Sequence, residues 1–455
     1  MRQSQPGPIR VTDQQYRLLD ANGDYFFWCG DTAWNLFASL DLDEARRFLT
    51  LRAQQGFNVI QAVGYFEHDC RKRPAHMGQW AMHDQDPAKP NDAYFDHVEK
   101  VMNIADSVGL HIAFVPTWGH LVSPMWAGGD PLFTAEKARI YGEYVGKRFG
   151  GRKNLIWVNG GDRPVNSVAE LEIWRNLAQG IRSTESIRHL MTFHTCGFRC
   201  SSEFVHDEPW LDMNMQQSGH GRLLDRVDQR IANTLSLTPA KPVLDGEICY
   251  EDHPVSFRAA NGRFGAWDVR VAAYRCVFSG GCGVTYGASA IWQFFSDRYP
   301  VIMGSVPSMD WKQSMYLPGA AQMGYLRQLM ERFADKSLHP CGSIYNQSDY
   351  DGEAACTFRG TESPKRAAGQ GQSLHKQRGE IDLALHTAHH ANTHNAAVGC
   401  SEFQIGLHQI APCNVQNDID LLNVACVSEL CGEAALTVVR YKRRTERLHC
   451  ITSRR

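Results

Sequence analysis

Residues 43–65, DEARRFLTLRAQQGFNVIQAVGY, contain one complete helix-to-strand unit. The first half predicts an amphipathic helix over 43–55, because apolar side chains recur at helical spacing: Ala45, Phe48, Leu49 and Ala53. Gly56 then ends the helix, since glycine readily takes the left-handed conformation that follows one. The run from Asn58 to Tyr65 is almost continuously apolar, as in a parallel strand covered on both faces. The stretch therefore predicts a β/α fold.

The same unit recurs along the first 340 residues. Helical patterns over 93–108 and 135–149 also end at glycines, Gly109 and Gly150. Eight short runs predict strands, of which the sixth is polar: Phe26–Asp31, Asn58–Tyr65, His111–Gly119, Asn154–Asp162, Leu190–Cys196, Met213–Gly219, Lys241–Tyr250 and Gly283–Phe294. Eight such units predict a (β/α)8 TIM barrel of the α/β class. A doubly wound open sheet is the alternative, but no glycine-rich phosphate-binding loop follows the first run.

Polar and aromatic side chains stand at the C-terminal ends of these runs, the face of a barrel where catalysis takes place. They are Asp31, Trp118, His120, Asp162, His194, Gln217, Glu247 and Trp292. Strand ends without a function usually turn with glycine, asparagine or serine. We therefore expect an active site that is built from several strand ends.

Two acids in this set predict the chemistry. Asp162 follows two glycines in Asn159–Pro164 (NGGDRP), and Glu247 ends an apolar run in Lys241–Glu251 (KPVLDGEICYE). Taken alone, each acid also has a structural interpretation. Asp162 could cap a turn or pair with Arg163, and Glu247 could belong to a surface ion pair. Together they match glycoside hydrolysis, in which two carboxyl groups flank one bond. We predict Asp162 as general acid/base and Glu247 as nucleophile, with carboxyl groups roughly 5–5.5 Å apart, as in retaining enzymes.

The remaining predicted site residues would bind a sugar. Aromatic rings stack on the apolar C–H faces of sugars, and polar side chains bind hydroxyl groups. The predicted substrate-binding residues are Asp31, Trp34, Trp118, His194, Gln217, Tyr250 and Trp292. This chemistry requires no cofactor and no metal. A metal-dependent barrel hydrolase is a lesser alternative, because several histidines lie near strand ends but no HExxH motif occurs.

Composition limits the partners. The formal net charge is −2, which gives no reason to expect nucleic acid or an anionic membrane. No stretch of 18 apolar residues occurs, and no signal peptide is visible at the N-terminus. The chain as given fits a cytoplasmic enzyme, and a secreted or periplasmic one if the N-terminus is incomplete. The 14 cysteines form no CxxC pair, and the sequence does not indicate an oligomeric state.

The C-terminal segment differs from the rest. After Phe358 the only aromatic residues are Phe403 and Tyr441, and seven of the 14 cysteines lie at or after Cys341. A β-sandwich needs many aromatic and β-branched residues on its strands. We therefore expect two parts, a barrel over 1–340 and, over 341–455, an atypical or disordered β-sandwich remnant. A shifted reading frame or degenerate evolution would explain this remnant.

Five motifs in residues 9–335 resemble the apiosidase-like glycoside hydrolases of family 140, some of which are labelled collagen-binding. The motifs are Phe27–Trp34 (FWCGDTAW), Gly56–Gln61 (GFNVIQ), Trp157–Arg163 (WVNGGDR), Asp245–Glu247 with Tyr250 and Glu251, and Thr285–Gly287 with Ile291–Gln293. The resemblance covers about 70% of the chain. It implies a barrel of clan A with Asp162 and Glu247 in the roles given above.

The resemblance also implies a substrate. The family's founding activity is the release of apiose from side chains of the pectic polysaccharide rhamnogalacturonan II, so we expect an oligosaccharide or polysaccharide of the plant cell wall. Its members usually carry a secretion signal and an aromatic-rich C-terminal β-sandwich, and this sequence has neither feature. The alternative from another class is a carbohydrate- or matrix-binding protein without activity, which would have no use for two facing acids.

Overall fold

The computed structural model describes residues 6–334 except 13–15, 67–72, 77, 126–129, 222–225, 300 and 302–305, and beyond them six strands. The chain divides into two compact units. The first comprises Met1–Val277 and Gly281–Glu331, and the second Phe278–Gly280 and Arg332–Arg455. All the predicted site residues belong to the first unit.

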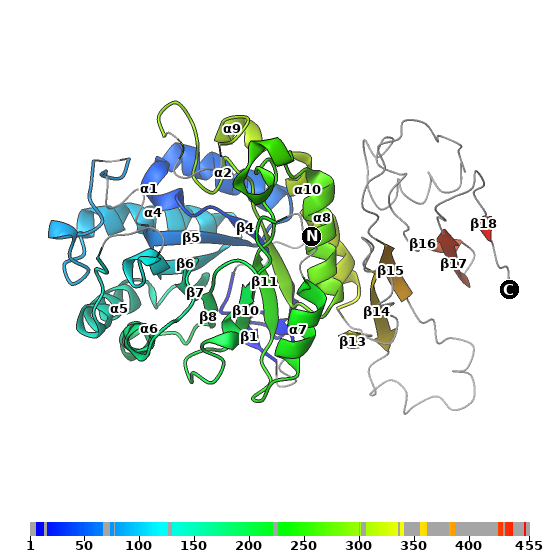
Figure 1. Ribbon diagram of the computed structural model, residues 1–455, viewed down its shortest axis with the longest axis horizontal. Helices are drawn as coiled ribbons and strands as arrows, with labels where there is room; N and C mark the ends of the chain where they lie inside the picture. Colours follow the sequence, from blue (N-terminus) through cyan, green and yellow to red (C-terminus); the bar gives the residue numbers. More distant parts are fainter. Residues whose placement is uncertain are drawn as a thin grey trace. The chain divides into compact units, whose positions relative to one another are not determined.

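The first unit is built on a curled parallel sheet (Figure 1). Its strands pair in the order β8-β7-β6-β5-β4-β12-β11-β10, and the short β9 (Arg199–Cys200) is antiparallel to β10. β8 is also linked to the residues just before β10, because the Asp212 N–H donates to the Met191 carbonyl at 2.9 Å. The parallel strands are β4 (Trp28–Thr32), β5 (Val59–Tyr65), β6 (His111–Thr117), β7 (Leu155–Gly160), β8 (Met191–His194), β10 (Asn214–Gln217), β11 (Val243–Glu247) and β12 (Gly283–Tyr286).

Each of the eight predicted strand runs overlaps one of these parallel strands, so the barrel prediction is confirmed. The polar sixth run forms β10, which pairs in parallel with β11. Hydrophobic periodicity is weakest there because Gln216 and Gln217 are buried polar residues, and the Gln216 side chain is satisfied by hydrogen bonds with Asp245 and Arg230.

Helices follow the strands and pack on the outside of the sheet, as Figure 1 shows. The helices expected after residues 43, 93 and 135 are present, and N-terminal caps from Asp41, Asn91 and Thr134 explain where they begin. The α-helices are α1 (Leu36–Ser39), α2 (Leu42–Gln54), α4 (Asp92–Ser107), α5 (Ala135–Phe149), α6 (Val168–Thr184), α7 (Val227–Leu235), α8 (Ala266–Phe278), α9 (Trp311–Ser314) and α10 (Pro318–Arg332). Single 3-10 turns are η1 (His83–Gln85), η2 (Gly119–Leu121), η4 (Ser201–Glu203), η5 (Val255–Phe257) and η6 (Ala259–Asn261). No described helix is long and apolar enough to span a membrane.

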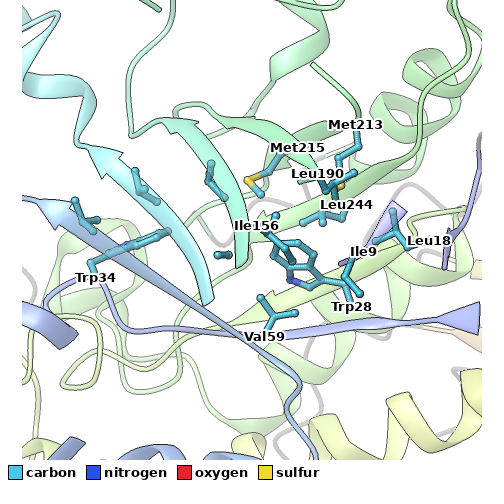
Figure 2. Packing of buried hydrophobic residues seen from close by; sticks show 14 of the residues in the cluster. Ile9, Leu18, Trp28, Trp34, Val59, Ile156, Leu190, Met213, Met215 and Leu244 are labelled. Atoms are coloured by element: carbon cyan, nitrogen blue, oxygen red, sulfur yellow. The ribbon is translucent and has the colours of Figure 1, made fainter. Parts of the chain in front are cut away.

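The inside of the barrel is a packed apolar core. In Figure 2 the Trp28 ring lies among Val59, Ile156 and Leu244, and its Nε1 donates to Thr285 Oγ1 at 3.0 Å. A small antiparallel sheet contributes Leu18 to the same cluster. Its strands are β1 (Arg10–Val11), β2 (Leu18–Leu19) and β3 (Tyr25–Phe26). The filled interior leaves the ends of the strands as the place for chemistry.

The second unit contains two three-stranded antiparallel groups among its described residues. These are β13 (Ser337–Pro340), β14 (Ala355–Thr361) and β15 (Asp382–His386), and β16 (Cys426–Leu430), β17 (Glu433–Val439) and β18 (Cys450–Ile451). The prediction of an atypical β-sandwich remnant over 341–455 lies largely outside the described residues.

Candidate active site

Asp162, His194 and Glu247 meet at the C-terminal ends of three strands. Glu247 is the last residue of β11, His194 is the last of β8, and Asp162 comes two residues after β7. One side-chain oxygen of each acid and one ring nitrogen of His194 all lie within 4.8 Å of one another. The two acids singled out in the sequence therefore face each other across the end of the barrel.

The backbone that carries Asp162 is unusual. Gly160, Gly161 and Asp162 have φ values of 91°, 124° and 51°, three successive residues in a region that side chains rarely adopt. A Cβ on Gly160 would collide with the His194 carbonyl oxygen, and one on Gly161 with the Trp118 ring. A non-glycine residue in this conformation costs about 1–3 kcal/mol, and such strain clusters at functional sites. The NGGD motif thus supplies the close approach and the turn that present Asp162.

Arg163 holds the backbone of this turn. Its Nη1 donates to the Asp162 backbone carbonyl at 2.6 Å, and its Nε donates to the Ser123 carbonyl at 3.0 Å. His120 bonds the third guanidinium nitrogen at 2.6 Å. Arg163 therefore fixes the turn that presents Asp162, and its positive charge also acts to lower the pKa of Asp162.

His194 lies between the two acids. Its Nδ1 accepts the Asp162 backbone N–H at 3.4 Å. Its Nε2 lies 3.1 Å from Glu247 Oε2. The imidazole is fully buried and orients both the turn and the carboxylate.

Glu247 is 3% exposed and lies between two imidazoles. His220 Nε2 lies 2.9 Å from its Oε1, opposite His194 on Oε2. Burial is the largest single effect and favours the neutral acid, but His194 and His220 together outweigh it and hold the pKa of Glu247 well below its usual value. Glu247 is thus a buried carboxylate that stays ionised, not the surface ion pair that its motif alone allowed.

Asp162 has the opposite tendency. Burial of its carboxyl, and next the negative charge of Glu247, raise the pKa of Asp162 from 3.8 to about 6. A hydrogen bond from the Gln217 side chain reduces this rise. Two neighbouring acids whose pKa values are pushed apart can act as one proton donor and one anion at the same pH.

Comparison with known proteins identifies the family of the chain. Residues 12–335 match the model of the apiosidase-like catalytic domain. The chain belongs to the apiosidase-like family. A solved glycoside hydrolase is 31% identical, with a TM-score of 0.68 over 78% of this chain and 81% of that one. A family 5 glycoside hydrolase from Bacteroides vulgatus ATCC 8482 is 32% identical, with a TM-score of 0.69 over 78% of each chain.

A more distant likeness concerns the fold alone. An exo-beta-1,4-mannosidase from Opitutaceae bacterium strain TAV5 is 14% identical, with a TM-score of 0.50 over 71% of this chain and 63% of that one. No curated protein matches the sequence. Family membership and the glycoside hydrolase neighbours identify the apiosidase-like chain as a glycosidase.

Aromatic side chains of the apiosidase-like domain surround the acids. The Trp34 ring lies 4.9 Å from the Trp118 ring and edge-on to His194 at 5.2 Å, and its Nε1 donates to Tyr250 Oη at 3.1 Å. Trp292 packs in the same cluster, and its buried Nε1 has no hydrogen-bond partner among the described residues. An unpaired buried donor in this cluster is suited to a ligand oxygen.

Asp31 is placed apart from the other predicted site residues. It points outward from β4 and forms a 2.6 Å ion pair with Arg52 of α2, both side chains being 0% exposed. Burial raises the pKa of Asp31 to about 6 in spite of this arginine. Asp31 therefore joins the barrel wall to a helix and does not face Glu247.

His220 was not singled out as a partner of Glu247 from the sequence. It follows β10 by three residues, and its histidine type suggested at most a metal ligand. Its ring stacks on His253 with centroids 4.4 Å apart and contacts Tyr250 at 4.5 Å. Its position just beyond a strand end could have marked His220 as a site residue. The sequence does not indicate its partner, because Glu247 lies 27 residues away.

Asp162, His194 and Glu247 also have the ligand types and spacing that could hold a metal ion. Two carboxylates and one imidazole would suit a divalent cation. A metal role competes with the acid/base pair, because a bound cation would keep both acids ionised.

Proposed function

We propose that this glycosidase hydrolyses its substrate with retention of anomeric configuration, with Asp162 as general acid/base and Glu247 as nucleophile. The observation that supports the proposal is the pair itself. Its oxygens lie within 4.8 Å of each other, near the ~5–5.5 Å of retaining enzymes and below the ~6.5–9.5 Å of inverting ones. The opposed pKa directions of the two acids match the two roles.

The reaction would take two steps. Protonated Asp162 donates its proton to the leaving oxygen while a Glu247 oxygen attacks the anomeric carbon, so the glycosidic bond breaks and a glycosyl ester forms. Asp162, now ionised, takes a proton from water, and the resulting hydroxide attacks the anomeric carbon. The ester bond breaks, Glu247 is restored as a carboxylate, and Asp162 is again protonated.

The substrate we propose is a side chain of a plant cell-wall pectic polysaccharide, with apiose as the released sugar. Family membership supports this choice. Trp34, Trp118, Tyr250 and Trp292 would contact the sugar ring, and His194 and Gln217 its hydroxyl groups. Asp31 is left out of this set because its carboxylate is bound to Arg52.

Azide rescue of two glycine variants tests the roles separately. Glycine makes room for azide, and at position 162 it also tolerates the left-handed backbone. With 4-nitrophenyl apiofuranoside and azide, Asp162→Gly should yield the apiosyl azide of retained configuration, and Glu247→Gly the inverted one. The control variant is Asp207→Asn, which removes an exposed carboxylate. This variant should form no azide adduct. Equal configurations from both variants, or an inverted product from the unchanged enzyme, would contradict the proposal.

The grouping of Asp162, His194 and Glu247 favours a second candidate, a metal-dependent hydrolase. Dialysis against EDTA, followed by addition of Zn²⁺ or Mn²⁺, separates the two. Full activity after EDTA supports the acid/base pair, and loss that either metal restores supports the second candidate. Binding of the oligosaccharide without any turnover would indicate a non-catalytic carbohydrate-binding protein.

A further inference from the structure

Two exposed phenylalanines near the acids have strained backbones. Phe198 is 45% exposed and Phe257 54% exposed, and no other described phenylalanine is exposed. Their φ values are 63° and 61°, in the left-handed region that large side chains avoid. Exposed apolar rings on unfavourable backbone are typical of binding sites, since neither feature helps the free protein.

Both rings contact one segment, residues 218–221, which follows β10. An ideal Cβ on Gly221 would lie 2.8 Å from Phe198 Cζ, so the ring rests directly over that glycine. The Phe257 ring meets the ring of the preceding residue, His220, edge-on at 5.6 Å. The Ser256 N–H donates to the His220 carbonyl at 2.8 Å and ties the Phe257 turn to the segment.

This segment connects the rings to the reacting groups. His220 Nε2 lies 2.9 Å from Glu247 Oε1, and its buried Nδ1 has no hydrogen-bond partner among the described residues. The Phe198 N–H donates to the Gln217 carbonyl at 2.7 Å, and Gln217 is the partner of Glu247 in the register of β10 and β11. The backbone of Phe198 is therefore bound to the strand end beside the nucleophile, and the Phe257 ring contacts the histidine that bonds the nucleophile.

We propose that Phe198 and Phe257 form the subsite for the leaving-group sugar, the part of the substrate beyond the bond that is cleaved. This inference rests on the proposed function, because the leaving group is the part whose oxygen Asp162 protonates. The sugar released on that side needs an apolar surface for its C–H face, and the exposed rings provide one. The enzyme would then select for a sugar, not a small alcohol, as the leaving group.

The test compares two substrates that share the released sugar. One is an apiose-containing oligosaccharide from rhamnogalacturonan II, and the other is methyl apiofuranoside, whose methanol leaving group is too small to reach either ring. The readout is the ratio of kcat/KM for the oligosaccharide to kcat/KM for the methyl glycoside. Phe198→Ala and Phe257→Ala should each lower this ratio about tenfold, the effect of losing one ring contact. Phe198→Tyr and Phe257→Tyr, which keep a ring, should restore most of it.

Tyr16→Ala is the matched control, because Tyr16 is also 45% exposed but lies ahead of β2 in the antiparallel sheet. Its ratio should equal that of the unchanged enzyme. A ratio that stays constant in both alanine variants, whether or not overall activity falls, overturns the subsite. An unchanged enzyme that cleaves neither substrate contradicts the proposed function instead. In that case binding of the oligosaccharide is measured for the Glu247→Gln variant and for the double variant that also carries Phe198→Ala. A higher Kd in the double variant supports the subsite, and an equal Kd overturns it.

Discussion

Neutralising Glu247 should lower the pKa of Asp162. The perturbation is Glu247→Gln, which keeps the shape of the side chain and removes one negative charge. In the unchanged protein this charge lies within 4.8 Å of Asp162 and is the second cause, after burial, of a pKa of about 6. Asp162 should then ionise at a lower pH, because its anion no longer meets a second anion.

The magnitude follows from Coulomb's law. Two unit charges 4.8 Å apart interact by about 3.5 kcal/mol at an effective dielectric constant of ~20, and by about half of that at ~40. Although burial is the largest cause of the raised pKa, part of the Asp162 residue stays exposed, so solvent screens the pair and the weaker figure applies. At ~1.4 kcal/mol per pKa unit, the pKa of Asp162 should fall by about one unit, to about 5. Burial, which the substitution leaves in place, keeps it above 3.8.

The assay is an NMR titration of protein labelled with 13C at the aspartate carboxyl carbon. Asp162→Asn identifies the signal of Asp162, and asparagine tolerates the left-handed backbone at this position. Asp207→Asn removes an equal charge from the surface and should leave the pKa of Asp162 unchanged. In the unchanged enzyme, kcat/KM should fall as pH rises through about 6, because only protonated Asp162 can donate a proton. A pKa of Asp162 that stays near 6 in Glu247→Gln would refute electrostatic coupling of the pair.

Three further predictions concern other parts of the molecule. His220→Gln should raise the pKa of Glu247, because it weakens one of the two histidine interactions that lower this pKa. The acidic limb of the pH profile of kcat/KM should therefore move to higher pH. A limb that does not move would show that His220 does not stabilise the Glu247 carboxylate. Arg52→Met should destabilise the fold by about 3–5 kcal/mol in urea unfolding at pH 7.5, because it leaves Asp31 buried without a partner. The loss should be smaller at pH 5, below the pKa of about 6 where Asp31 becomes neutral, and adding Asp31→Asn should recover most of it. A chain that ends at Pro340 should fold as a barrel and keep its activity, because the last barrel helix ends at Arg332; an insoluble product would contradict two separable domains.

The sequence predicted the barrel because its evidence is local. Helix periodicity, glycine stops and buried apolar runs each depend on neighbours within a few residues, and eight repeats leave few topologies. The pairing of Asp162 with Glu247 could be predicted for a related reason. Strand ends of a parallel barrel share one face, so two acids far apart in the chain are brought together by topology alone.

Orientation within a strand was decided by the tertiary structure. Asp31 ends an apolar run just as Glu247 does, and both strands are buried on both faces, so hydrophobicity does not indicate which side chains point inward. The pleat turns Trp28 into the barrel and Asp31 toward Arg52. Contacts through space were likewise hidden. His220 reaches Glu247, and Phe198 covers Gly221, only because loops after different strands meet, and their approach depends on packing that no local pattern encodes.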